Sequence, residues 1–405
     1  MKSNRAKAKK NISTRKRLAA GVALLAIAGS GSSAFALDHP DALFLSSYHD
    51  LWLSEGLDGN AFGAPSRWEA SSGLEINAGV AARQVFTADF DGDGLDDIAT
   101  TIRSRLYVRT NNGENGFGAP VLQSLGWNFR LSMNSNFQLF PGDFNGDGLA
   151  DVAMTSGCGE IFIGYNSGGV VGPPALAVPS LPYVPTYGIW FGVGDVNGDG
   201  LDDMVNVQRG DSGGAVAAAV AGPTGEFITS DWGSPNFTWD LGQHSGILLA
   251  DFTGDGKADL LNLTQYTDAW VAVSTGSQFD NPTRWATLGF RDAYIESQEP
   301  VFAAFAIDFN NDGKVDIVDL TDTGELWGAA STGSSFGAPI KMAVTGFTHN
   351  VFYGPAQTYF GHFTGTAATK AAQPDWTQLI TRESTRTQIL PTPTPSLTPI
   401  PATKQ

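Results

Sequence analysis

Short apolar stretches alternate with turns rich in Gly and Asp along most of this chain. Stretches of this length, bounded by turn residues, are typical of β-strands. No helical period appears downstream of the N-terminal 36 residues. The stretches before the turns are VFTADF, LFPGDF, WFGVGD, ILLADF and FAIDF, and those after them are DIATTI, DVAMT, DMVNV, DLLNL and DIVDL. A third stretch follows in each case (LYVRT, IFIGY, AVAAAV, AWVAVS and LWGAAS). The pattern predicts an all-β protein.

The turns themselves repeat a nine-residue motif. Its copies are DFDGDGLDD at 89–97, DFNGDGLAD at 143–151, DVNGDGLDD at 195–203, DFTGDGKAD at 251–259 and DFNNDGKVD at 308–316. A sixth copy, HFTGTAATK from His362, keeps the spacing but has lost the acids. Self-similarity at a fixed period indicates a repeat architecture.

A second motif, which we call a mark, recurs alongside the nine-residue motif. It is clearest as FGAP at 62–65, 117–120 and 336–339. The N-terminal piece has this mark without an acidic loop, and the C-terminal piece has the decayed loop and the strand-like WTQLI at 376–380 without the mark. Each end therefore supplies the half that the other lacks, as a closed ring requires. Four antiparallel strands per unit predict a β-propeller closed by its terminal strands, with six blades favoured and seven as the alternative.

The spacing of oxygen-bearing residues in the loops suits calcium, which binds 6 to 8 oxygens at about 2.3 to 2.6 Å. Side chains at loop positions 1, 3, 5 and 9 and the backbone carbonyl at position 7 are the predicted ligands. They are Asp89, Asp91, Asp93, Leu95, Asp97; Asp143, Asn145, Asp147, Leu149, Asp151; Asp195, Asn197, Asp199, Leu201, Asp203; Asp251, Thr253, Asp255, Lys257, Asp259; and Asp308, Asn310, Asp312, Lys314, Asp316.

Crowded carboxylates repel each other unless a cation neutralises them. Asp-Gly turns without metal are the alternative, but five copies in register favour metal binding. The absence of His and Cys from the loops disfavours transition metals, and magnesium is the weaker candidate because it requires strict octahedral geometry. The first loop, with four carboxylates and the adjacent Asp96, is expected to bind most tightly. The loops with Lys257 and Lys314 are expected to bind more weakly. Gly94, Gly92 and Asn311 are expected to allow the positive φ that the turns need.

The acidic loops and FG-x-P marks together resemble FG-GAP, or VCBS-type, repeats, the units of the integrin α-subunit propeller and of many secreted bacterial proteins. The resemblance covers about residues 38 to 390. It implies up to five structural Ca²⁺ ions, each between the first and second strands of a blade. No metal is expected at the decayed copy. Integrins have seven such repeats, so the apparent six leaves the blade count open.

Charge and targeting features point outside the cytosol. Residues 1–36 hold eight of the 24 basic residues and none of the 41 acidic ones, so the remainder has a formal charge of −25. This charge disfavours nucleic acid and anionic membranes as partners. The basic start, the apolar LAAGVALLAIAG and Ala34-Phe35-Ala36 predict a signal peptide over 1–36. The propeller then spans 37–390, and the Pro/Thr-rich 391–405 predicts a disordered tail or linker. Cys158 alone cannot form an internal disulfide.

Aromatic residues in the connections between the fourth strand and the next first strand predict a partner face opposite the metal loops. The candidates are Trp127, Tyr183, Trp190, Trp239, Tyr294 and Tyr353, although about half such residues are expected in the core. In contrast, Trp52, Tyr107, Phe162, Trp270 and Trp327 recur at one third-strand position and are expected to pack within blades.

Residues 209–214, RGDSGG, contain an integrin-binding tripeptide and a protease-like string. Ser212 lacks a matching His base, and the Arg209-Gly210-Asp211 string is more often a chance turn. The leading hypothesis is a secreted (extracellular or periplasmic), monomeric, calcium-binding propeller that binds an extracellular glycan or protein, for example in adhesion, without catalysis. The alternatives are a polysaccharide lyase or hydrolase, and a structural surface-assembly module.

Overall fold

The computed structural model describes residues 39–364, apart from internal gaps, and the short segment 378–379. The gaps are 47–49, 59, 71–83, 103, 114–115, 128–137, 157–158, 182–188, 209–213, 234, 236–245, 265–267, 291–303, 322 and 348–356. The chain divides into Met1–Ala36 and Leu37–Gln405. Everything below concerns the second unit. The expected signal peptide and Pro/Thr tail lie outside the described residues.

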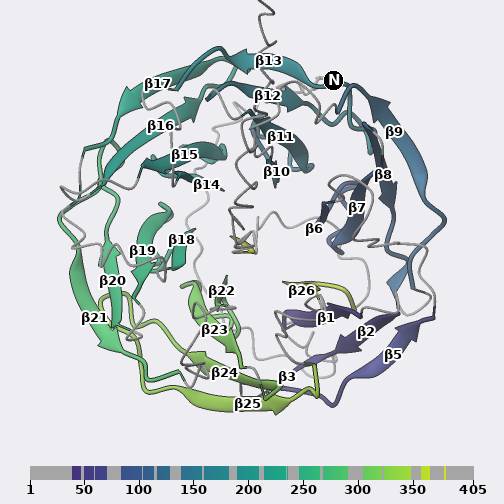
Figure 1. Ribbon diagram of the computed structural model, residues 1–405, viewed down its shortest axis with the longest axis vertical. Helices are drawn as coiled ribbons and strands as arrows, with labels where there is room; N and C mark the ends of the chain where they lie inside the picture. The colour runs from purple at the N-terminus through teal and green to yellow at the C-terminus, as the bar shows by residue number, and fades with distance from the viewer. Residues whose placement is uncertain are drawn as a thin grey trace, which may run out of the picture. The chain divides into compact units, whose positions relative to one another are not determined.

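Six four-stranded antiparallel sheets form the blades of a ring (Figure 1). Blade 1 contains β26 (Gln357–Gly361), β1 (Asp41–Leu45), β2 (Leu51–Ser54) and β5 (Ser66–Glu69). Blade 2 contains β6 (Val85–Ala88), β7 (Asp97–Ile102), β8 (Arg105–Arg109) and β9 (Val121–Leu125). Blade 3 contains β10 (Gln138–Gly142), β11 (Asp151–Thr155), β12 (Ile161–Gly164) and β13 (Ala175–Val178).

The other three blades follow in chain order. Blade 4 contains β14 (Ile189–Gly194), β15 (Asp203–Gln208), β16 (Ala215–Ala221) and β17 (Phe227–Asp231). Blade 5 contains β18 (Gly246–Ala250), β19 (Asp259–Leu263), β20 (Asp268–Ala272) and β21 (Thr283–Thr287). Blade 6 contains β22 (Ala304–Ile307), β23 (Asp316–Leu320), β24 (Glu325–Ala329) and β25 (Ile340–Val344). A small ribbon, β3 (Gly56–Leu57) and β4 (Ala61–Phe62), precedes β5.

Strands from the two ends of the propeller close the ring. β26 pairs antiparallel with β1, with Phe360 opposite Ala42 and Tyr359 opposite Leu43. The prediction of a propeller closed by its terminal strands is therefore confirmed, with six blades, and the alternative of seven is wrong. The predicted strand at 376–380 is present as β27 (Gln378–Leu379), which adds to the inner edge of blade 6 beside β22.

The hydrophobic core lies between neighbouring blades. Leu261 and Leu263 of blade 5 belong to one buried cluster with Ala306 and Ile317 of blade 6, and similar clusters join the other blades. The apolar residue at loop position 2 enters these clusters in every copy of the motif, including the decayed one. Phe90, Phe144, Val196, Phe252, Phe309 and Phe363 are all at most 2% exposed. Each buried side chain of this kind stabilises the fold by about 1.5–3 kcal/mol, so the loops are anchored by apolar packing.

The recurring third-strand aromatics lie at the same point of five blades. A register shift directly precedes Trp52, Tyr107, Phe162, Trp270 and Trp327. Four of them, all except Tyr107, pack partly buried against the core clusters. The packing assignment is thus confirmed for these four, and all five side chains also keep a partly exposed surface.

Candidate metal centre and partner face

Each acidic loop connects the first and second strands of a blade and turns through two residues with positive φ. In the loop of blade 2, Gly92 has φ 80° and Gly94 has φ 90°. In the loop of blade 6, Asn311 has φ 56° and Gly313 has φ 82°. Only Gly adopts this region without steric cost, and Asn tolerates it best among the others. The predicted role of these positions is confirmed.

The aspartate at position 1 organises each loop through backbone N–H groups. In blade 2, Oδ1 of Asp89 accepts a hydrogen bond from Gly92 at 2.6 Å, and Oδ2 accepts one from Gly94 at 2.9 Å. Asp143, Asp195 and Asp251 accept equivalent bonds from the glycines at positions 4 and 6 of their loops. The loop is therefore folded around its own first carboxylate.

The aspartate at position 9 begins the second strand and is fully buried in every intact copy. In blade 2, Oδ1 of Asp97 accepts the N–H of Asn111 at 2.7 Å, and Oδ2 accepts that of Phe90 at 3.0 Å. This residue consequently ties the end of the third strand to the start of the loop. The same pairing holds for Asp151 and Asp203, whereas Asp259 accepts its loop hydrogen bond from the position-3 N–H of Thr253.

Burial raises the pKa of the position-9 carboxyls well above the usual range of aspartate. The pKa of Asp97 rises to about 8, because burial outweighs its hydrogen bonds and because Asp91 and Asp89 repel its charge. The pKa is raised to about 8 at Asp151 and Asp316, and to about 7 at Asp203 and Asp259. A cation beside each carboxyl would remove this cost of ionisation.

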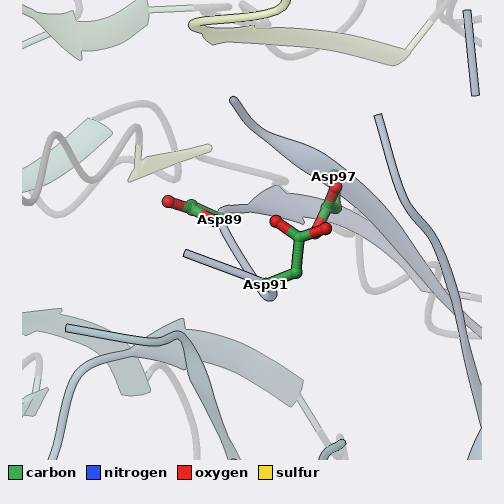
Figure 2. A group of neighbouring side chains, drawn as sticks. All are labelled: Asp89, Asp91 and Asp97. Atoms are coloured by element: carbon green, nitrogen blue, oxygen red, sulfur yellow. The ribbon is translucent and has the colours of Figure 1, made fainter. Parts of the chain in front are cut away.

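The geometry of the first loop fits a hard cation. One oxygen each of Asp89, Asp91 and Asp97 lies within 4.8 Å of the others (Figure 2). Ligands on opposite sides of a Ca²⁺ ion are about 5 Å apart, so a single ion can contact all three. In blade 6, Oδ2 of Asp316 is buried and has no hydrogen-bond partner in the described part of the chain. Such an oxygen is available to a metal. Ligation by the predicted residues stays a prediction.

Asp93 and Asp96 lie differently from the three clustered aspartates. Asp93 is not part of the cluster, and its Oδ1 accepts the N–H of Leu95 at 2.9 Å. Oδ2 of Asp96 accepts the N–H of His362 at 2.9 Å, so this carboxylate faces the neighbouring decayed copy. This carboxylate therefore joins two blades, and the expectation that Asp96 strengthens the first site stays a prediction.

Two lysines compete with any cation in the fourth and fifth acidic loops. Lys257 Nζ lies 2.6 Å from Asp255 Oδ2, and Lys314 Nζ lies 3.2 Å from Asp312 Oδ2. Each ammonium group thus pairs with the position-5 carboxylate, which is a predicted ligand. This pairing supports the expectation of weaker binding in these loops.

Replacing both lysines should strengthen calcium binding. We expect the Lys257→Ala/Lys314→Ala variant to bind Ca²⁺ at these two loops about 2- to 5-fold more tightly, the range that an exposed ion pair contributes. Isothermal titration of residues 37–405 measures the change. Arg105→Ala, which removes an exposed charge at the start of β8, is the control. Equal dissociation constants in both variants would contradict the competition.

In the decayed copy, the role of the position-9 aspartate is taken by Asp41, from the N-terminal part of the propeller. Asp41, at the start of β1, accepts N–H groups from Phe363 at 3.1 Å and Thr364 at 2.8 Å through Oδ2. Its Oδ1 accepts the N–H of Gly56 at 2.9 Å. Sequence reasoning gave Asp41 no role. The alignment of DALFL, which begins with Asp41, with DLLNL, which begins with Asp259, was the signal that could have found it.

Backbone hydrogen bonds connect the loops around the ring. The N–H at position 8 of each intact loop donates to the position-1 carbonyl of the preceding copy. The five donors are Asp96, Ala150, Asp202, Ala258 and Val315, with distances of 2.7 to 3.0 Å. At the end of the third strand, side chains add a second link: Asn166 Nδ2 to the carbonyl of Phe90, and Ser331 Oγ to that of Phe252. These hydrogen bonds therefore couple the conformation of each loop to that of the neighbouring loop.

The predicted partner face is only partly described. Trp127 is fully buried, and its Nε1 donates to Ser124 Oγ at 2.8 Å. Its assignment to the ligand face is wrong, because its ring fills the core between blades 2 and 3. Trp190 is a half-buried residue of β14 that packs against the cluster between blades 4 and 5. The other four candidates, Tyr183, Trp239, Tyr294 and Tyr353, lie outside the described residues, as do Arg209-Gly210-Asp211, Ser212 and Cys158.

Together, the ring and its acidic loops define a six-bladed β-propeller built from repeats with a candidate metal loop in five blades. Residues 89–154 and 143–206 match the model of the FG-GAP-like repeat. The chain therefore carries FG-GAP-like repeats, as its resemblance to this family implied. No curated protein matches the chain. Among the described residues, no helix is long and apolar enough to cross a membrane.

Several solved structures are similar to this chain. A lectin from Agrocybe aegerita that recognises non-reducing terminal N-acetylglucosamine is 19% identical, with a TM-score of 0.55, over 81% of this chain and 87% of the lectin. The Photorhabdus luminescens Tc holotoxin pore is 16% identical (TM-score 0.47) over 79% of this chain, which spans only 14% of that chain. AofleA from Arthrobotrys oligospora is 10% identical (TM-score 0.43), with coverage of 82% and 91%. At 19% identity, the similarity to the lectin concerns the fold alone.

Proposed function

We propose that this protein is a secreted binding module, a calcium-stabilised propeller that recognises an extracellular glycan or protein without chemistry of its own. The observation that supports binding most directly is the fold similarity to the A. aegerita lectin over 81% of this chain. The basic and apolar N-terminus followed by Ala34-Phe35-Ala36 supports export. We favour a glycan as the ligand because that lectin recognises a terminal sugar.

The candidate metal loops support the calcium part of this proposal. Asp89, Asp91 and Asp97 bring one oxygen each to a common point, and calcium there would hold the first and second strands of a blade together. It would supply positive charge to the loop, while the chain's own residues supply the oxygens and the turn. Calcium is structural in this proposal, and the ligand binds elsewhere.

The arrangement of acids supports binding rather than catalysis. Buried general acids are recognised by a raised pKa and access to substrate. The pKa is raised to about 7 or 8 at the position-9 residues, such as Asp97 and Asp203, and burial also raises the pKa of Asp202, whose Oδ2 accepts the N–H of Asp143. Both side-chain oxygens of Asp97 and of Asp203 accept backbone hydrogen bonds inside the blades. These buried aspartates therefore stabilise the fold.

A glycan array probed with the mature chain, residues 37–405, tests this function. With Ca²⁺ present we expect selective binding to a group of related glycans, and with EDTA we expect the signal to fall as the propeller loosens. An array without signal would contradict glycan recognition. Depolymerisation of a polysaccharide panel by the pure protein would favour the lyase or hydrolase alternative.

A further inference from the structure

Three blades share a side-chain arrangement that neither the metal loops nor the core explains. In blades 1, 5 and 6 an acid lies at or just before the start of the third strand, two residues before a tryptophan: Asp50 and Trp52, Asp268 and Trp270, Glu325 and Trp327. On the fourth strand, a basic residue lies directly opposite each tryptophan. The register pairs are Trp52 with Arg67, Trp270 with Arg284 and Trp327 with Lys341. We refer to each set of three as an acid–Trp–base triad.

The acid and base of each triad form an ion pair at the surface. The nitrogen–oxygen distances are 3.9 Å for Arg67 and Asp50, 3.7 Å for Arg284 and Asp268, and 2.5 Å for Lys341 and Glu325. The acids are 22%, 24% and 30% exposed in chain order, and the bases are 56%, 56% and 41% exposed. Both charges of each pair can therefore be reached from solvent.

The tryptophan in each triad is partly buried and held in place. Trp52, Trp270 and Trp327 pack against the core clusters and keep part of their surface exposed. In blade 6, Trp327 Nε1 also donates to Glu325 Oε2 at 3.0 Å, so the indole and the ammonium of Lys341 fix the same carboxylate. A side chain that is already immobilised loses little conformational entropy when a ligand binds.

The triads occupy one continuous arc of the ring. Their fourth strands, β21, β25 and β5, follow one another around its outer edge (Figure 1). The same cross-strand positions in the other three blades lack the triad. They hold Tyr107 opposite Leu122, Phe162 opposite Leu176, and Ala217 opposite Asp231. Core packing acts in all six blades, so it does not account for a charge pair confined to three neighbours.

From this arrangement we propose that the arc of blades 5, 6 and 1 is a set of three equivalent subsites for neutral sugar residues of one glycan chain. This inference rests on the proposed glycan-binding function and locates it. An indole face packs against the apolar face of a pyranose ring. Beside it, one sugar hydroxyl donates to the carboxylate while the adjacent hydroxyl accepts from the guanidinium or ammonium group.

Charge selects a neutral ligand. Each triad contains one carboxylate and one cation, so it attracts neither anions nor cations strongly, and the acidic surface of the mature chain repels polyanions. Subsites of this small size bind a single sugar weakly. Three of them on one rigid arc can engage one chain together, and such multivalency raises the apparent affinity by about 10²- to 10⁴-fold. The arc should therefore prefer polymers to monosaccharides.

The test compares two triple variants at the same cross-strand position. Arg67→Ala/Arg284→Ala/Lys341→Ala removes the exposed bases of the arc, and Leu122→Ala/Leu176→Ala/Asp231→Ala is the matched control in the other blades. Binding to immobilised mannan, galactan, xyloglucan and chitin is measured with Ca²⁺ present, with the corresponding free monosaccharides as competitors. All six side chains lie on outer strands and are exposed, and thermal melting checks that both variants remain folded.

We expect the wild-type chain and the control variant to bind at least one polysaccharide equally, and the arc variant to bind it at least about 100-fold more weakly, as the loss of multivalency requires. Arg284→Ala alone should give an intermediate loss. Equal binding by the arc variant and the wild type would overturn the placement of the subsites while leaving glycan recognition intact. A folded wild-type chain that binds none of the four polysaccharides, with a glycan array also without signal, would overturn both proposals.

Discussion

Removing divalent cations should lower the melting temperature of the mature chain by more than about 20 °C. A site that is saturated at 100 times its dissociation constant stabilises the folded state by about 2.7 kcal/mol, and five such loops are predicted. In a domain of this size, each kcal/mol shifts Tm by about 2 °C. The effect should reach the whole ring, because position-8 N–H groups such as that of Ala150 bind the position-1 carbonyl of the preceding loop.

Thermal melting with EDTA and then with excess CaCl₂ measures this effect. The second addition should restore Tm, and MgCl₂ at the same concentration should restore less of it, because Mg²⁺ prefers strict octahedral geometry and retains its waters. An unchanged melting temperature after complete chelation would show that the acidic turns hold no stabilising ion. The loops would then be kept only by their hydrogen bonds and by the buried position-2 residues.

Replacing Asp41 should destabilise the closure of the ring more than any exposed substitution. Asp41→Ala leaves the N–H groups of Gly56, Phe363 and Thr364 without their acceptor. A buried donor that loses its partner costs about 1–3 kcal/mol, so we expect a loss of at least about 3 kcal/mol in the free energy of unfolding. Urea denaturation at a fixed Ca²⁺ concentration measures it.

Two further variants make the result specific. Asp41→Asn keeps one acceptor oxygen and should lose less than Asp41→Ala. Asp58, whose side chain is 99% exposed, provides the matched control in the same blade, and Asp58→Ala should change stability by no more than about 0.5 kcal/mol. If Asp41→Ala were as stable as Asp58→Ala, the terminal strands would be held together by packing and backbone pairing alone.

Local patterns in the sequence were sufficient for the strands and the loops, and they favoured the six blades that the structure has, although they left seven open. The motif DFDGDGLDD places its glycines where a positive φ is needed, and the structure has Gly92 and Gly94 in that conformation. The offset between the two ends of the chain indicated a shared blade, which β26 and β1 form. These features depend on residues close together in sequence, or on a repeat that shows itself five times.

The partner face could not be predicted equally well. Trp127 looked like an exposed ring in a connection, but it is fully buried between blades 2 and 3. An aromatic residue in the sequence can belong to the core or to a binding surface, and the sequence alone does not distinguish the two. Only the packing of neighbouring blades decides which surface of the ring reaches water.

What the sequence by itself determined is the repeating unit: its strands, its acidic turn, and the need for a ring that joins the first strand to the last. What only the tertiary structure decided is which side chains meet across that ring. Asp41 reaches Phe363, Asp96 faces His362, and three bases lie opposite three tryptophans on adjacent blades. The physical reason is that these contacts join different strands or opposite ends of the chain, so their geometry exists only after the strands pair and the blades close.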